Sequence, residues 1–165
     1  PGRPVWGAVK APGVGRGGQC AVVCEVTVRA ERATVGDPHV RVGSVAGDGG
    51  AAIWPLAVGP ARAKQYLLTG DPVSAAEAER IGLVNFVVPA DRLQEDALVF
   101  AERLAAGAPL ALRHTKIAVN KLVKDARNIA FDYSTMAEGP TMASTAPTPA
   151  VKAIKATRKP LLAGV

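Results

Sequence analysis

The chain has 165 residues, of which 48% are hydrophobic and 4% aromatic, and its formal net charge is +6. A chain of this length can form one hydrophobic core but is too short for two full domains. Its apolar content excludes a chain that is disordered overall. The scarcity of aromatic rings disfavours a base-stacking surface for single-stranded nucleic acid. The basic residues, which are densest near the C-terminus, either attract phosphate groups or simply face solvent.

The first predicted element is an apolar strand over residues 4–9, followed by the glycine-rich stretch APGVGRGGQC at 11–20. Gly13, Gly15 and Gly18 match the G-x-G-x-x-G pattern of a dinucleotide-binding turn. A glycine-rich turn between a strand and a helix can equally direct backbone N–H groups at an oxyanion, so these residues alone leave both interpretations open. A core strand this close to the first residue also leads us to expect further chain upstream.

A short helix is expected next, over residues 18–24, and its two cysteines, Cys20 and Cys24, would share one helix face. Among the apolar residues between them we expect buried, unreactive thiols and neither a disulfide nor a metal site. The sequence contains no signal peptide and no apolar run of membrane-spanning length, so we expect a cytoplasmic protein.

Two more strands and a second glycine-rich loop follow. The alternating run EVTVRA predicts a strand over 25–30, and residues 33–35 predict a short strand that ends at the turn GDP. The run GSVAGDGG at 43–50 contains four glycines and Asp48, and it predicts a loop with accessible backbone in which an aspartate is a common turn residue. A helical portion begins at Ala51 and contains Trp54, which we expect in the core or in a pocket wall.

From Pro60 onward the pattern is mainly helical. Ser74 and Glu77 have the spacing of a capping box, which accounts for both residues, and the helix that they start at residue 75 is expected to end at Gly82. The other predicted elements are helices over 61–68, from Asp91 to Ala106, over 109–123 and over 151–158, and a strand over 83–88. Residues 139–150, rich in Pro, Thr and Ala, are expected to interrupt the helical pattern.

Three segments resemble the crotonase (enoyl-CoA hydratase/isomerase) superfamily: PVWGAVKAPGVGRGGQCAVVCEV, ATVGDPHVRVGSVAGDGGAAIWPL and LLTGDPVSAAEAERIGLVNFVVP. They occur in the family's order, and the likeness extends over nearly the whole chain. The resemblance implies an α/β fold: a crotonase-like ββα spiral, N-terminally incomplete, over residues 1–105, followed by a helical oligomerisation region over 106–165. It also implies a trimer or a dimer of trimers that takes acyl-CoA thioesters, without a separate cofactor or metal ion and without a nucleic-acid or membrane partner.

The resemblance also decides between the two interpretations of the first glycine-rich loop. Members of this family stabilise a thioester enolate with two backbone N–H groups, one of which belongs to the loop that matches Gly15, Arg16 and Gly17. Arg16 stands where glycine is usual, and its side chain could instead bind a carboxylate or phosphate of the ligand. The second donor comes from an upstream segment of the family. Dinucleotide binding is the weaker alternative, because no parallel-sheet continuation follows the motif.

Family hydratases place two carboxylates that position water and exchange protons in its addition, and the corresponding residues here are Gln19 and His39. An amide orients water but cannot accept a proton near neutral pH, whereas a histidine can act as a general base. The alternative for His39 is a polar residue that lines the pocket or bonds to backbone. Asp48 lies one position beyond an extra catalytic aspartate of some members, so enolate chemistry through Asp48 or Asp37 is a further possibility.

The last helix of the family carries basic groups near the CoA nucleotide, and Arg158 and Lys159 match that stretch, with Lys155 as a further candidate. The sequence therefore predicts an acyl-CoA hydratase or isomerase whose hydratase chemistry is impaired or altered. The alternative is a non-catalytic crotonase-like scaffold or fragment that binds CoA or a partner chain.

Overall fold

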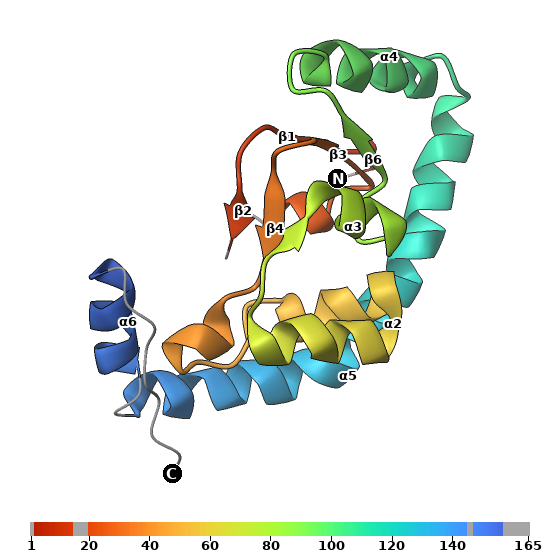
Figure 1. Ribbon diagram of the computed structural model, residues 1–165. Helices are drawn as coiled ribbons and strands as arrows, with labels where there is room; N and C mark the ends of the chain where they lie inside the picture. The colour runs from red at the N-terminus through yellow and green to blue at the C-terminus, as the bar shows by residue number, and fades with distance from the viewer. Residues whose placement is uncertain (1, 15–19, 145–146, 157–165) are drawn as a thin grey trace.

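The computed structural model describes residues 2–14, 20–144 and 147–156, and its strands form two small sheets (Figure 1). The first sheet has the order β1-β3-β6 with all strands parallel, and it contains β1 (Trp6–Val9), β3 (Val26–Ala30) and β6 (Phe86–Val88). In the second sheet β4 pairs parallel with β2 and antiparallel with β5, the strands being β2 (Gly13–Val14), β4 (Thr34–Gly36) and β5 (Val73–Ser74). The strands predicted from residues 4–9, 25–30 and 33–35 are confirmed within one or two residues.

Strand β3 lies at the centre of the first sheet and is buried on both faces. Val28 and Ala30 pack with Leu93 on one face, while Thr27 and Arg29 occupy the opposite face with 2% and 0% exposure. Thr27 donates from Oγ1 to the carbonyl of Ala21, at 2.8 Å, in the helical turn that follows the first glycine-rich loop. The polar side chains of this alternating strand therefore face the interior.

Six helices of the described residues follow strand β4: two precede β5, one connects β5 to β6, and three follow β6. They are η1 (His39–Val42), α2 (Gly50–Thr69), α3 (Ala75–Arg80), α4 (Leu93–Ala105), α5 (Pro109–Ala143) and α6 (Pro147–Lys155). Helix α2 contains both predicted helical portions, which join at Gly59, a non-helical residue with φ of 77° that precedes Pro60. Trp54 of α2 is 1% exposed and packs with Val35 of β4 and Val73 of β5, so it belongs to the core.

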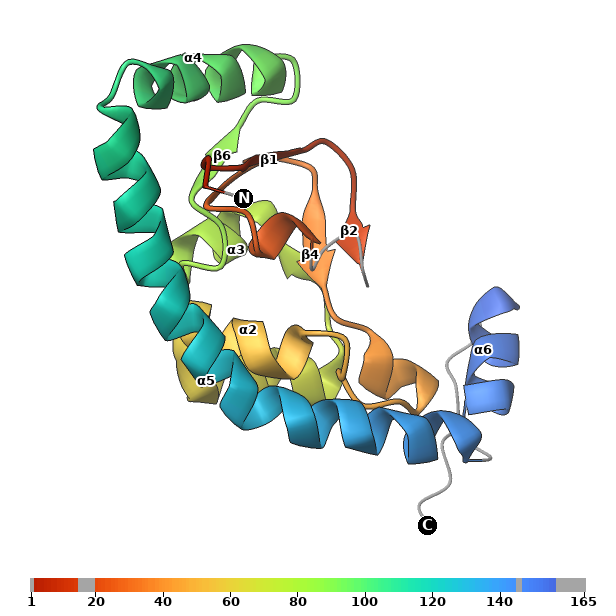
Figure 2. The same ribbon diagram turned by 180° about the vertical axis from the view of Figure 1, so that it is seen from behind.

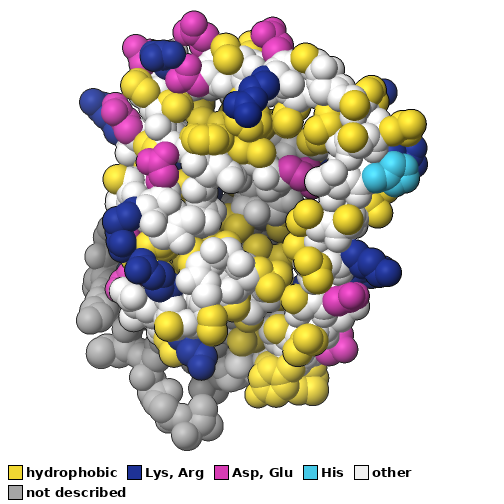
Figure 3. All heavy atoms as spheres, turned by 90° about the vertical axis from the view of Figure 1, so that its right-hand side faces the viewer, with side chains coloured by type: hydrophobic (Ala, Val, Ile, Leu, Met, Phe, Trp, Pro, Cys, Tyr) yellow, Lys and Arg dark blue, Asp and Glu magenta, His cyan; other side chains and the backbone are white. Residues whose placement is uncertain are grey.

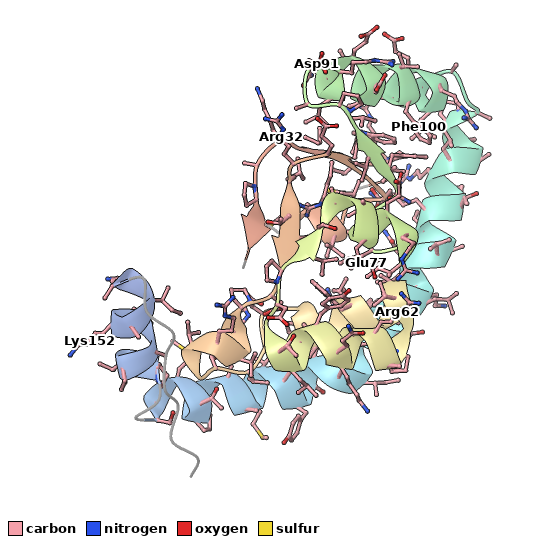
Figure 4. The ribbon with its side chains drawn as sticks, viewed as in Figure 1. Arg32, Arg62, Glu77, Asp91, Phe100 and Lys152 are labelled. Atoms are coloured by element: carbon pink, nitrogen blue, oxygen red, sulfur yellow. The ribbon has the colours of Figure 1, made fainter. Side chains whose placement is uncertain are left out.

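The start of α3 confirms half of the predicted capping box. Ser74 Oγ accepts a hydrogen bond from the Glu77 backbone N–H at 3.2 Å, and Gly82 follows the helix with φ of 81°. The Glu77 carboxylate does not return to the N-cap: it accepts two hydrogen bonds of 2.6 Å from Arg80 and one from the Tyr66 hydroxyl at 3.3 Å. Figure 4 shows Glu77 and Arg62 close together, and their ion pair at 3.9 Å adds a second link between α2 and α3.

Helix α5 is longer than expected. The sequence predicted an end near residue 123, but the helix continues to Ala143 and passes along α2, as the view from behind shows (Figure 2). Tertiary contacts hold the added turns: Ser134 is buried, and Thr141 Oγ1 accepts a hydrogen bond from the backbone N–H of Val45 at 3.3 Å. The predicted interruption over 139–150 is therefore wrong for residues 139–143, and α6 begins at Pro147 instead of residue 151.

Two smaller expectations also differ from the structure. Asp91 does not cap α4, because the helix begins at Leu93 with Arg92 at the N-cap and without a capping side chain. Cys20 is exposed and Cys24 is half-buried, so the prediction of two buried thiols is wrong, although both cysteines are free as expected.

Candidate active site

His39 is positioned by the turn that ends strand β4. The chain leaves β4 at Gly36, passes through Asp37 and Pro38, and enters the short helix η1 at His39. Asp37 Oδ1 accepts a hydrogen bond from the backbone N–H of His39 at 3.3 Å, the arrangement by which aspartate commonly stabilises a turn. The local sequence GDPHV thus holds the two side chains on the same side of the turn.

The Asp37 carboxylate also contacts the imidazole of His39. Asp37 Oδ1 and His39 Nδ1 form a short hydrogen bond and an ion pair when the ring is protonated. The Asp37 side chain is 1% exposed, whereas that of His39 is 17% exposed. A buried carboxylate that engages Nδ1 fixes the ring orientation and leaves Nε2 to meet a ligand or water.

Asp48 lies on the other side of the imidazole. It belongs to the second glycine-rich loop, before the start of α2, and its Oδ2 is 3.6 Å from His39 Nε2. The other oxygen, Asp48 Oδ1, is buried and lacks a hydrogen-bond partner among the described residues. Asp37, His39 and Asp48 therefore form a continuous group of titratable side chains, and the structure brings together two of the predicted site residues, His39 and Asp48.

The pKa of His39 is raised above its ordinary value of 6.5, chiefly because the Asp37 carboxylate hydrogen-bonds to the ring. Burial of the ring acts in the opposite direction, and the negative charges of Asp37, Asp48 and Glu138 add to the rise. The imidazole is thus a stronger base than a free histidine, and it holds its proton to higher pH.

Glu138 reaches this site from α5 and was not predicted from the sequence. Its carboxylate lies over Gly47, where an added Cβ would be 2.6 Å from Glu138 Oε2. Ninety-odd residues separate Glu138 from His39, and no local pattern marks it, because its position depends on the passage of α5 beneath the second glycine-rich loop.

Gly50, the first residue of α2, allows the close approach of this helix to Asp37. A Cβ at Gly50 would overlap Asp37 Oδ2, so the site requires a residue without a side chain at this point. Gly50, the last glycine of the run GSVAGDGG, therefore serves the packing of the Asp37 carboxylate.

Among the described residues, Asp37, His39 and Asp48 are also the group that could hold a metal ion. Each offers one ligand atom, and these atoms lie within 4.8 Å of one another. A proton on His39 and a divalent cation would compete for the same negative surroundings, since metal binding requires the neutral imidazole. Chemically, the group can transfer a proton through His39 Nε2.

The remaining predicted site residues are only partly described. Gly15, Arg16, Gly17 and Gln19 lie outside the described residues, although β2 leads directly into that loop. The same holds for Arg158 and Lys159.

Lys155, the third predicted CoA contact, is exposed at the end of α6, a helix that contacts η1 and hence the segment that carries His39. Figure 4 shows Lys152, one turn earlier, pointing away from the fold.

A hollow lies on another part of the surface, away from His39. A pocket of about 910 Å³ separates the N-terminal segment from α4 and α5, and its lining includes Trp6, Leu110, Arg113 and Lys116 but none of the residues around His39. Figure 3 faces the side on which α4 and the first half of α5 lie, where apolar side chains gather. No helix formed by the described residues has both the length and the hydropathy that a membrane-spanning segment needs.

Comparison with known proteins places the chain within one family. The family model described as "Enoyl-CoA hydratase/isomerase" matches residues 2–161. Among curated relatives, a probable enoyl-CoA hydratase of Rhizobium meliloti is 40% identical over 119 residues, which are 72% of this chain and 46% of that protein. A probable mitochondrial enoyl-CoA hydratase of Dictyostelium discoideum is 35% identical over 118 residues, or 72% of this chain and 43% of the relative. The chain thus spans about half the length of the curated relatives that it matches.

Solved structures give the same result. An enoyl-CoA hydratase from Mycobacterium avium subsp. paratuberculosis superposes with a TM-score of 0.92 at 27% identity, covering 99% of this chain and 66% of that one. An enoyl-CoA hydratase/isomerase from Mycobacterium paratuberculosis superposes with a TM-score of 0.84 at 34% identity, covering 90% of this chain and 59% of the other. The α/β, crotonase-like fold expected from the sequence is confirmed.

Proposed function

Because this chain belongs to the enoyl-CoA hydratase/isomerase family, we propose that it acts on acyl-CoA thioesters through an enolate, with His39 as the acid–base group. The observation that carries this proposal is the contact between Asp37 and the imidazole Nδ1 of His39. The buried carboxylate orients the imidazole through Nδ1, and Nε2, which lies 3.6 Å from Asp48 Oδ2 and so beyond hydrogen-bond distance, can exchange a proton as general acid–base catalysis requires.

In a hydration, the neutral Nε2 of His39 takes a proton from water as the water oxygen bonds to the β-carbon of the enoyl group. The electron pair of the carbon–carbon double bond then moves toward the thioester oxygen, which gives the enolate. Transfer of the proton from Nε2 to the α-carbon completes the addition of one water molecule and restores the neutral ring. Asp37 keeps Nε2 directed at the reacting atoms and stabilises the imidazolium that forms between the two transfers.

The enolate oxygen needs hydrogen-bond donors, and we assign this role to the backbone of Gly15, Arg16 and Gly17, on the resemblance of this loop to the family's oxyanion loop. A removed oxyanion donor typically costs a factor of about 10²–10³ in rate. Gln19, next to this loop, would orient water without exchanging protons. We therefore expect hydratase chemistry that depends on His39 alone and is slower than that of a site with two carboxylates.

We further propose that Lys155, Arg158 and Lys159 contact the phosphates of CoA, and that the chain functions as a trimer or a dimer of trimers in the cytoplasm. Support for an oligomer comes from α5, where Leu122 and Ile129 are 74% and 84% exposed, an unusual state for large apolar side chains. A native mass that corresponds to a monomer alone would contradict the oligomer.

The test is the loss of enoyl absorbance when purified protein meets crotonyl-CoA, compared with His39→Gln and with the double variant Gln19→Glu, His39→Glu. We expect turnover by the parent protein and a loss of about 10²–10⁴ in kcat for His39→Gln, the usual contribution of a general base. Turnover by the double variant alone would show an intact pocket that lacks its proton-transfer groups. If none of the three proteins turns over crotonyl-CoA but calorimetry shows that they bind it, a non-catalytic scaffold is favoured.

A further inference from the structure

Arg29 of β3 is a buried cation that the proposed chemistry does not use. Its side chain is among the largest fully buried ones, with 0% exposure. The guanidinium donates one hydrogen bond, from Nη1 to the carbonyl of Thr34 at 3.1 Å. Its other two nitrogens, Nε and Nη2, are buried and have no hydrogen-bond partner among the residues that the structure describes.

This state is energetically costly for the protein as it stands. A guanidinium stays protonated in proteins, so burial cannot be relieved by loss of the charge. Among the residues that the structure describes, no carboxylate forms an ion pair with Arg29, and burial lowers its pKa without an opposing charge. A buried charge without a counter-ion is strongly unfavourable, because the lost hydration is not replaced.

The free atoms also have a definite geometry. Nε and Nη2 form one edge of the planar guanidinium, and two parallel N–H groups on such an edge match the two oxygens of a carboxylate. Arg29 shares its face of β3 with Thr27, which contacts the helical turn at Ala21, so the edge lies on the side of the sheet that this turn covers. One monovalent anion would neutralise the charge and satisfy both nitrogens.

We propose that Arg29 is a carboxylate-binding residue that takes the acid group of a small organic acid in a bidentate ion pair through Nε and Nη2. The site is independent of the proton transfer assigned to His39. The acid group belongs either to a free carboxylic acid or to the far end of a carboxylated acyl group on CoA. Because the side chain is fully covered, binding requires a local opening of the fold, and samples must be equilibrated for hours before measurement.

The test is thermal unfolding of the parent protein, Arg29→Met and Arg32→Met in glutarate, with sodium chloride of equal ionic strength as the reference. Methionine keeps an unbranched apolar side chain without the guanidinium charge. Arg32 is the matched control, since it also carries a positive charge, lies three residues further on, and points away from the fold in Figure 4.

For the parent and for Arg32→Met we expect a saturable rise of the midpoint, by roughly 5–10 °C at a hundred times the dissociation constant. Arg29→Met should show no such rise, and in chloride alone it should unfold at or above the temperature of the parent, because an uncompensated charge has been removed. Two results would overturn the proposal: a lower midpoint for Arg29→Met without any response of the parent to glutarate, or equal responses of all three proteins.

Glutaryl-CoA and butyryl-CoA then identify the source of the acid group. A larger shift with glutaryl-CoA than with butyryl-CoA, lost in Arg29→Met, assigns the site to a carboxylated acyl group, and equal shifts assign it to the free acid. Butyryl-CoA should stabilise the parent and Arg29→Met alike. A failure of butyryl-CoA to bind either protein would count against the proposed function. It would not affect the conclusion about Arg29, which depends on the glutarate result.

Discussion

The Asp37 carboxylate holds both the backbone N–H and the Nδ1 atom of His39, two residues further along the chain. One buried side chain therefore fixes the turn after β4 and the orientation of the imidazole at the same time. Asp48 faces the opposite ring nitrogen at 3.6 Å, so the proton-transfer group lies between two carboxylates.

The first prediction concerns the titration of His39. Two-dimensional NMR of the imidazole should give a pKa above 6.5 in the parent protein, and Asp37→Asn should lower it, because the hydrogen bond that the Asp37 carboxylate accepts from the ring is the largest cause of the rise. Asp48→Asn is the comparison, with a smaller decrease, since Asp48 acts only through its charge. Equal decreases in the two variants would contradict the assigned order of causes.

The second prediction follows from linkage between protonation and folding. A raised pKa stabilises the folded state fully below the unfolded value of 6.5, and this contribution is lost as the pH rises through the folded pKa. Urea unfolding at a series of pH values should therefore show a decrease of the unfolding free energy across that window. In His39→Gln this part of the decrease should be absent.

The third prediction concerns the close approach of α2 to the site. Gly50→Ala adds a methyl group that overlaps Asp37 Oδ2, so the carboxylate must move away from His39. We expect the free energy of unfolding to fall by about 1–3 kcal/mol, the usual cost of overpacking, and the pKa of His39 to decrease. Chemical denaturation and NMR titration measure the two effects.

Gly139→Ala is the control for this substitution. An added Cβ at Gly139 in α5 meets nothing within 4 Å, and alanine favours a helix over glycine by up to about 1 kcal/mol. It should leave the pKa of His39 unchanged and the stability equal or higher. A decrease in stability similar to that of Gly50→Ala would argue against a specific clash with Asp37.

The fourth prediction tests the capped start of α3. Ser74→Ala removes the side chain that accepts the Glu77 N–H and should lower the free energy of unfolding by about 1 kcal/mol. Ser74→Asp retains an acceptor and places a negative charge at the helix N-terminus, so it should be close to the parent. Crotonyl-CoA turnover should not change in either variant, because the cap accounts for both Ser74 and Glu77.

The sequence predicted correctly those helix and strand boundaries that depend on residues close to one another in the chain. The Ser74 cap, the end of α3 at Gly82 and the strand before the first glycine-rich loop all follow from residues within a few positions of one another. The extent of α5 could not be found in this way, since its last turns contain Pro140 and are held by contacts such as Val45 to Thr141. Tertiary packing decided that boundary.

The residues of the candidate site also differ in whether the sequence indicated them. The resemblance indicated His39 and Asp48, with Asp37 as an alternative for enolate chemistry, but it did not predict the contact between Asp37 and His39. Glu138 and the burial of Arg29 had no such indication. Alternation in EVTVRA is typical of a half-exposed strand, whereas β3 is covered on both faces, by Leu93 of the distant helix α4 on one and by the turn at Ala21 on the other.

The proton transfer assigned to His39 is tested most directly by the pH dependence of kcat/KM for crotonyl-CoA in the parent protein and in Asp37→Asn. If His39 transfers the proton, the parent's activity should rise with pH along a limb whose midpoint lies above 6.5, and the limb of Asp37→Asn should lie at lower pH. A limb that stays in place when Asp37 is replaced, or turnover that survives in His39→Gln, would show that another group transfers the proton.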